Sequence, residues 1–200
     1  MIILVTGASG FLGMNLLSTL ALRHPHARLI ACDLTPPDPL QPLGATGSCD
    51  IAYHALDLRD PAACLQLLRQ LGPTHVIHAA AITPAALIES DLSVNLHGTR
   101  HIFAAAVGVG TVQRFVFLSS SGVYRQANDD LRCDEDHPLQ LDTPYASYKR
   151  DAELYLIEHR HELDVVIARV GPVYGPYERP RFSRPNTSLC LLYTSPSPRD

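Results

Sequence analysis

The sequence has no tryptophan, two methionines and an aromatic content of only 6% over 200 residues. It also lacks any apolar run of the roughly 18 residues that a membrane-spanning helix needs. Its formal net charge of −4 argues against a general nucleic-acid or anionic-membrane binder. No basic segment precedes the apolar N-terminus, so a signal peptide is not indicated. We therefore expect a cytoplasmic protein that binds neither nucleic acid nor membrane.

The cysteines and histidines lack the spacing of a structural site. The five cysteines are an odd number, are widely separated and form no C-x-x-C pair: Cys32, Cys49, Cys64, Cys133 and Cys190. This pattern predicts free, buried or half-buried thiols rather than disulfides or a zinc site. The ten histidines have no acidic or cysteine partners at metal-ligand spacing, so no metal is expected. His78, at the end of an apolar run, is expected to have a packing role.

A hydrophobic content of 46% is arranged as short apolar runs that alternate with helical patterns. The runs predict strands at 2–6, 28–33, 51–56, 75–79, 114–119 and 165–169. Helices are predicted at 11–23, from 61 onward behind a capping Asp60, at 91–107 and at 144–161. This alternation is typical of βαβ units, so we expect an α/β fold with a doubly wound parallel sheet, Rossmann-like, in three α/β/α layers. The proline- and glycine-rich segment 35–49 is expected to be a surface loop.

A glycine-rich motif, Thr6-Gly7-Ala8-Ser9-Gly10-Phe11-Leu12-Gly13, lies between the first expected strand and the first expected helix. Gly7 permits a sharp turn, Gly10 permits close approach of a pyrophosphate, and Gly13 permits close helix–strand packing. The following helix would present its N-terminus to the phosphates. Asp33 ends the second expected strand, where a carboxylate accepts hydrogen bonds from ribose hydroxyls and repels a 2′-phosphate. The motif therefore predicts a dinucleotide site that favours NAD over NADP.

A second motif indicates proton transfer. Tyr145 and Lys149 are four residues apart on one expected helix and so share a face. An ammonium group near a phenol favours the phenolate, which makes Tyr145 a candidate general acid/base. The serine run 119–121 ends the fifth expected strand and offers a hydroxyl that could bind the same substrate oxygen.

In this order the motifs resemble those of the extended short-chain dehydrogenases/reductases, in the NAD-dependent epimerase/dehydratase family. The likeness extends from Ile2 to about Pro180. Besides the two motifs above, it includes Asp57-Leu58, His78-Ala79-Ala80-Ala81, Asn95 before Gly98-Thr99, and Val173-Tyr174-Gly175-Pro176.

The resemblance assigns roles to individual residues. Asp57 and Leu58 would flank the adenine, and Ala79, Ala80 and Ala81 would line the cofactor phosphates and ribose. The cofactor site would also include Phe11 and Leu12 of the glycine motif. Asn95 would support the active site, and Lys149 would also hold the nicotinamide ribose. The family's catalytic hydroxyl lies three residues before the Val-Tyr pair, which selects Ser120 from the serine run.

Two departures from the family pattern bear on the reaction. Family dehydratases follow the catalytic hydroxyl with Asp-Glu, whereas this chain has Ser121 and Gly122, so dehydration is disfavoured. Many sugar-nucleotide epimerases carry asparagine where this chain has Pro172. The resemblance then implies an NAD-dependent epimerase or dehydrogenase acting on a sugar or sugar nucleotide, and a homodimer in the full-length protein. Epimerase and dehydrogenase are not separated, and the contrasting hypothesis is a non-catalytic, NAD-binding redox-sensing module.

The last eleven residues, from Cys190 to Asp200, match the translation of a common transposase-type sequencing adaptor and show no periodicity. We therefore expect residues 1–188 to form the NAD-binding domain and residues 189–200 to be a non-native tail without structure. Family members place much of their substrate-binding domain after this point. The 200-residue chain is accordingly expected to lack most of that domain and to be inactive.

Overall fold

The computed structural model describes residues 1–35, 49–83, 91–124 and 134–178. The elements within these ranges are β1 (Ile2–Thr6), α1 (Phe11–Arg23), β2 (Arg28–Asp33), β3 (Asp50–Ala55), α2 (Pro61–Leu71), β4 (His75–His78), α3 (Val94–Val109), β5 (Arg114–Ser120), the short 3₁₀ helix η2 (Ser121–Val123), α4 (Pro144–Glu158) and β6 (Asp164–Val170). Most of segment 35–49 and the whole tail 189–200 lie outside the described residues, so the predictions made for them stay predictions.

The six strands form one sheet in the order β3-β2-β1-β4-β5-β6, and every neighbouring pair is parallel. This is the order of a doubly wound sheet: β2 and β3 are added on one side of β1, and β4, β5 and β6 on the other, so the strand order reverses between β1 and β4. The expected fold class is therefore confirmed. Helix α3 begins at Val94, later than predicted, because the Asp91 carboxylate accepts a hydrogen bond from the Ser93 N–H and forms a turn there.

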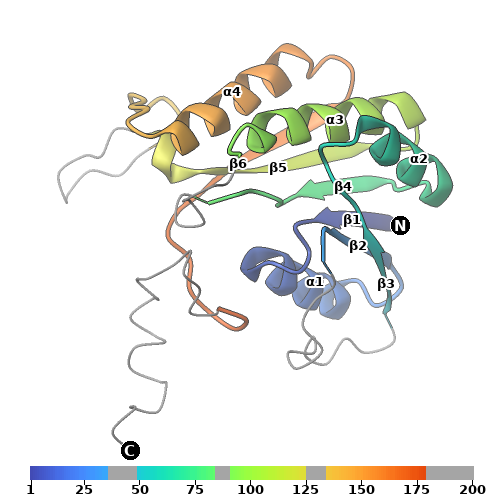
Figure 1. Ribbon diagram of the computed structural model, residues 1–200. Coiled ribbons are helices and arrows are strands. Elements are labelled where there is room, and N and C mark those ends of the chain that lie inside the picture. Colours follow the sequence, from blue (N-terminus) through green and yellow to red (C-terminus); the bar gives the residue numbers. More distant parts are fainter. Residues whose placement is uncertain (36–48, 84–90, 125–133, 179–200) are drawn as a thin grey trace, which may run out of the picture.

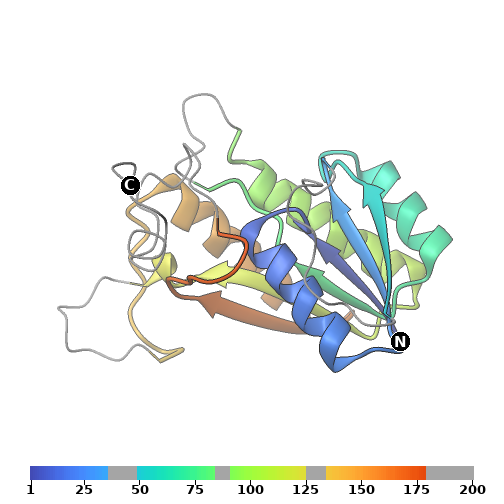
Figure 2. The same cartoon turned by 90° about the horizontal axis from the view of Figure 1, so that it is seen from below.

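Helices cover the two faces of the sheet unequally. In Figure 1, α2, α3 and α4 lie side by side above the sheet and α1 lies below it, and the turned view in Figure 2 shows α1 crossing the lower face. The larger core lies under α2, α3 and α4 and contains Phe103, Phe115 and Phe117. A smaller core between α1 and the other face of the sheet contains Val5, Leu17 and Leu29.

Local sequence signals fix where two of the helices begin. The Asp60 carboxylate accepts hydrogen bonds from the N–H groups of Ala62 and Ala63, and Pro61 occupies the first helical position of α2. Thr143 caps α4 in the same way through a hydrogen bond from the Ala146 N–H, again with proline next in the chain. Both arrangements satisfy N–H groups that a helix leaves unpaired. The Thr143 cap sets the start of the helix that carries Tyr145 and Lys149.

Cys32, Cys49 and Cys64 are free thiols, with Cys32 and Cys64 buried, as predicted. Cys133 and Cys190 lie outside the described residues. Burial raises the pKa of Cys32 to about 12 and that of Cys64 to about 11. No helix in the described ranges is both long and apolar enough to span a bilayer.

Candidate functional site

A pocket with a volume of about 270 Å³ opens at the carboxyl ends of the strands, beside the reversal point between β1 and β4. Such a crevice is where doubly wound sheets bind ligands. The β1–α1 loop and the start of α1, the segment after β4, the end of β5, α4, and the end of β6 with the segment after it line the pocket together. They are Gly7, Ser9, Gly10, Phe11, Leu12, Gly13, Ala79, Ala81, Thr83, Leu118, Ser119, Ser120, Tyr145, Lys149, Val170, Gly171, Val173, Tyr177 and Glu178.

The glycine-rich loop leaves no room for side chains at two positions. Gly7 has φ +69°, and a Cβ there would lie 2.7 Å from the backbone N and Cα of Ala80. A Cβ on Gly13 would lie 2.1 Å from the carbonyl oxygen of Gly7 and 2.6 Å from Cα of Ala8. The loop thus packs backbone on backbone, and α1 begins after Gly10 with no side chain capping it. The N-terminus of α1, with the positive end of the helix dipole, faces the pocket, which suits a pyrophosphate.

Asp33 lies at the end of β2, next to this loop. Its Oδ2 accepts a hydrogen bond of 2.9 Å from the N–H of Ser9, and its Oδ1 accepts one of 2.8 Å from the N–H of Leu34. Each carboxylate oxygen has a further lone pair with which it can accept a hydrogen bond from a hydroxyl group. Asp33 is not among the residues that line the pocket, but Ser9, which it binds, is. The carboxylate is therefore held at the edge of the loop.

His78 has a packing role, as predicted. It is 1% exposed, its Nδ1 lies 2.6 Å from Oγ1 of Thr6, and its Nε2 lies 3.0 Å from Oγ1 of Thr99. The Thr6 hydroxyl also accepts a hydrogen bond from the N–H of Ala80. Burial, aided by the charge of Lys149, lowers the pKa of His78 to about 3. A neutral imidazole therefore ties the ends of β1, β4 and helix α3 together beneath the pocket.

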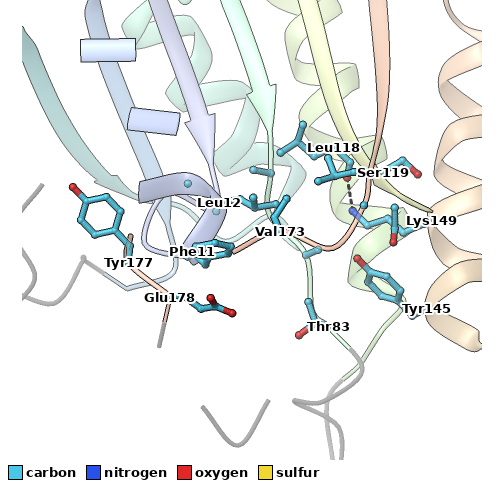
Figure 3. Close-up of a pocket in the computed structure, with 18 of the residues that line it drawn as sticks. Phe11, Leu12, Thr83, Leu118, Ser119, Tyr145, Lys149, Val173, Tyr177 and Glu178 are labelled. Carbon is cyan, nitrogen blue, oxygen red and sulfur yellow. Dashed lines mark hydrogen bonds between the residues drawn. The ribbon is translucent and has the colours of Figure 1, made fainter. Parts of the chain in front are cut away.

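Ser120, Tyr145 and Lys149 line the pocket, and Figure 3 shows the last two across it from Phe11 and Leu12 of the glycine-rich loop. Figure 3 shows Tyr145 and Lys149 projecting from the same helix toward this space. The Lys149 ammonium donates a hydrogen bond of 2.8 Å to the carbonyl oxygen of Leu118 and lies 5.9 Å from the centre of the Tyr145 ring. Ser120 Oγ accepts a hydrogen bond from the N–H of Gly122, so its own proton can still be donated.

Lys149 is 2% exposed, and burial lowers its pKa to about 8. The Lys149 ammonium also lies 4.7 Å from the centre of the Phe117 ring, a distance at which an aromatic face attracts a cation. A group with that pKa is mostly charged at neutral pH. Lys149 therefore places a desolvated positive charge close to Tyr145.

Of the remaining predicted residues, Ala79 and Ala81 line the pocket, whereas Asp57, Leu58, Ala80 and Asn95 lie outside its lining. Asn95 is buried and holds the backbone of Ile82 by two hydrogen bonds, accepting one from its N–H and donating one to its carbonyl. Asp57 is bound by the Arg59 guanidinium at 2.6 Å, and these hydrogen bonds lower its pKa. Leu58 packs against Gly98, because its Cβ lies 3.1 Å from the position that a Cβ on Gly98 would take. Contacts of Asp57 and Leu58 with adenine stay predictions.

The segment after β6 carries the Val-Tyr-Gly-Pro motif, but the sequence alone predicts no site residue in it. Val173, Tyr177 and Glu178 line the pocket, and Figure 3 shows them on the side of Phe11 and Leu12. Asn15 of α1 donates a hydrogen bond of 2.7 Å to the carbonyl oxygen of Pro176. Tyr177 adopts a left-handed backbone conformation, with φ +67°. The tie to Asn15 joins residues 161 positions apart, so no local pattern could have shown it.

The sequence also predicts no role for Glu153 of α4. Its carboxylate is fully buried and binds Ser119, Arg150 and Arg169. The signal in the sequence is its spacing, because Glu153 lies four residues after Lys149 and shares its helix face.

Comparison with known proteins agrees with this geometry. The model of the NAD dependent epimerase/dehydratase family matches residues 3–191. A UDP-glucose 4-epimerase of Mycolicibacterium smegmatis is 31% identical over 183 residues, which cover 88% of this chain and 58% of that protein. A 4-hydroxy-2-methyl-3-oxo-4-farnesyl-3,4-dihydroquinoline-1-oxide ketoreductase of Stigmatella aurantiaca is 32% identical over 158 residues, which cover 77% of this chain and 44% of that protein.

Among solved structures, the UDP-glucose 4-epimerase of Thermus thermophilus in complex with NAD superposes with a TM-score of 0.77 at 29% identity, covering 90% of this chain and 58% of that one. The chain spans about half the length of the curated relatives it matches. The family match extends over nearly the whole chain and includes every motif that lines the pocket. The chain therefore belongs to the NAD-dependent epimerase/dehydratase family.

Proposed function

We propose that this chain is the cofactor-binding part of an NAD-dependent epimerase or dehydrogenase that acts on a sugar or sugar nucleotide. The observation that carries the proposal is the shared pocket, which has the glycine-rich loop on one side and Ser120, Tyr145 and Lys149 on the other. The names of the relatives, a UDP-glucose 4-epimerase and a dTDP-D-glucose 4,6-dehydratase among them, support the substrate class.

The residues fit NAD. The glycine-rich loop packs backbone on backbone at Gly7 and Gly13, and this loop and the start of α1 line the pocket with few side chains between them and a bound pyrophosphate. Asp33 would accept hydrogen bonds from the adenosine ribose and disfavour a 2′-phosphate. When bound, NAD supplies a hydride acceptor. The same carboxylate and loop would hold it beside the part of the pocket that Tyr145 and Lys149 line.

Tyr145 takes a proton from a substrate hydroxyl at its phenolic oxygen, acting as general base, and returns it in the reverse step. Ser120 donates a hydrogen bond to the same substrate oxygen, which fixes the hydroxyl in place. Lys149 favours the phenolate of Tyr145 through its buried positive charge. Removal of water demands a further acid/base pair after Ser120. Ser121 and Gly122 begin the short helix η2 there and offer no carboxyl group, which favours epimerisation or oxidation over dehydration.

The test compares Tyr145→Phe with Tyr148→Phe in a full-length version of the protein. Both tyrosines belong to α4, but Tyr148 packs against the large core and is not part of the pocket lining. We expect Y145F to lower turnover roughly 100-fold or more with NAD affinity nearly unchanged, and Y148F to keep its turnover. Equal turnover by the two variants would contradict the assignment.

Substrates for this assay are a set of sugar nucleotides and sugar acids, followed through both the absorbance of reduced cofactor and product analysis. Net cofactor reduction identifies a dehydrogenase, and an isomerised product without net reduction identifies an epimerase. NAD binding without turnover of any of these substrates would instead favour a redox-sensing module.

A further inference from the structure

We propose that Glu153 is a positioning residue, whose buried carboxylate fixes α4 against the ends of β5 and β6 and sets the place and charge of the Lys149 ammonium. This inference rests on the proposed function, because it concerns the machinery assigned above. Glu153 itself lies outside the pocket lining and acts through Lys149.

The Glu153 carboxylate is held by four hydrogen bonds from three elements. Ser119 Oγ on β5 donates to Oε1 at 2.5 Å, and Arg169 on β6 donates through Nε to Oε1 at 3.0 Å and through Nη2 to Oε2 at 2.8 Å. Arg150, one turn earlier on α4, donates to Oε2 at 2.9 Å. Burial alone would raise the pKa of Glu153, but the hydrogen bonds from Arg169, Ser119 and Arg150 outweigh burial and lower it. Glu153 is therefore a fixed negative charge with no exposure to solvent.

These contacts lie directly behind the catalytic groups. Helix α4 holds two consecutive residues of β5, since Lys149 binds the carbonyl of Leu118 and Glu153 binds the hydroxyl of Ser119. The next residue of the strand is Ser120. The position of α4 along β5, and with it the relation of Tyr145 to Ser120, is thus fixed by the pair of bonds that Lys149 and Glu153 make.

Arg169 extends the same cluster around the loop that follows Ser120. Its guanidinium carbon lies 4.7 Å from the centre of the Tyr124 ring, and Tyr124 ends the short helix η2. The N–H of Tyr124 donates to the carbonyl oxygen of Ser121. One buried carboxylate therefore reaches β5 through Ser119 and the end of η2 through Arg169.

The charge of Glu153 also acts on Lys149. Burial lowers the pKa of Lys149 to about 8, and the negative charge of Glu153 opposes that shift. Around Lys149, β4 contributes His78, which burial keeps neutral near pH 7, β5 contributes the uncharged Phe117 ring, and α4 contributes Tyr145 and Glu153. Loss of the negative charge would let Lys149 lose its proton at a lower pH, and a neutral lysine does not favour the phenolate of Tyr145.

The chain offers a direct measurement, because Lys149 is the one lysine in its 200 residues. Incorporation of lysine labelled with ¹³C at Cε gives a single side-chain resonance, whose pH titration reports the pKa of Lys149 without cofactor or substrate. The variants are Glu153→Gln, which keeps the shape and removes the charge, and Glu153→Asp, which keeps the charge. Glu158→Gln is the matched control, since Glu158 is exposed on the same helix.

We expect E153Q to lower the pKa of Lys149 by about one unit, the low end of the effect of a nearby opposite charge. E153D should give a pKa of Lys149 between those of E153Q and the wild type, because its carboxylate keeps the charge but lies one methylene closer to its own backbone, and E158Q should leave the pKa unchanged. If E153Q does not fold by circular dichroism, E153D decides the test, and it must then lower the pKa slightly. A pKa of Lys149 equal to the wild-type value in folded E153Q would overturn the proposal. Where E153Q is unfolded, the same result in E153D would overturn it. Failure of the proposed function would instead appear as a missing turnover, which this titration does not involve.

Discussion

Replacement of Gly13 by alanine (G13A) sets a methyl group against the backbone of the loop that precedes α1. The added Cβ would lie 2.1 Å from the Gly7 carbonyl oxygen and 2.6 Å from Cα of Ala8, and neither atom belongs to a flexible side chain. Overpacking typically costs about 1–3 kcal/mol, and contacts this short with backbone place G13A at or above the upper end. Alanine regains about 1 kcal/mol of helix propensity. The net expectation is a loss of about 2 kcal/mol or more in the free energy of unfolding.

Gly108→Ala (G108A) is the matched control, because Gly108 also lies within a helix and its added Cβ would meet only Leu65 Cδ1, at an ordinary 3.5 Å. G108A should therefore be neutral or more stable by up to about 1 kcal/mol. Urea unfolding followed by circular dichroism measures both variants. For a chain of this size, the G13A loss corresponds to a fall in Tm of about 4–8 °C. If G13A proves as stable as G108A, the inference that Gly13 packs directly against the backbone of Gly7 and Ala8 is wrong.

Two further predictions concern cofactor choice and pH. NAD should bind at least tenfold more tightly than NADP, a difference of about 1.4 kcal/mol, and Asp33→Asn should narrow that preference; equal affinities by titration calorimetry would contradict the role of Asp33. His78 has a pKa of about 3 in the folded chain and an ordinary value of 6.5 when unfolded, so the unfolded state alone binds a proton between these values and stability falls as pH drops through that range. The loss attributable to His78 should be at most about 1.4 kcal/mol per pH unit below 6.5, and a His78→Asn variant unfolded in urea across pH 7 to 5 should lack that part of the slope.

Local sequence patterns were sufficient to predict the helices and strands and two motifs that line the pocket, the glycine-rich loop and the pair Tyr145 and Lys149. The alternation of apolar runs and helical segments predicted the six strands, because side-chain periodicity and crossover handedness restrict how such segments pack. Proline after Asp60 predicted the start of α2. The glycine spacing predicted a tight loop between β1 and α1, since Gly13 meets residues a few positions away and Gly7 meets the segment that follows the neighbouring strand β4.

Tertiary structure alone decided which distant groups meet. The carboxylate of Glu153 meets Ser119 across 34 positions and Arg169 across 16, and Asn15 reaches Pro176 across 161. His78 is neutral because Thr6, Thr99 and the sheet bury it, although its residue type alone suggests a group that titrates near neutral pH. Burial and hydrogen bonding depend on every element packed around a group, whereas periodicity and glycine spacing depend on neighbours along the chain. The sequence thus determined the frame and the residues at the ends of its strands, and the folded chain determined their charge states and their supports.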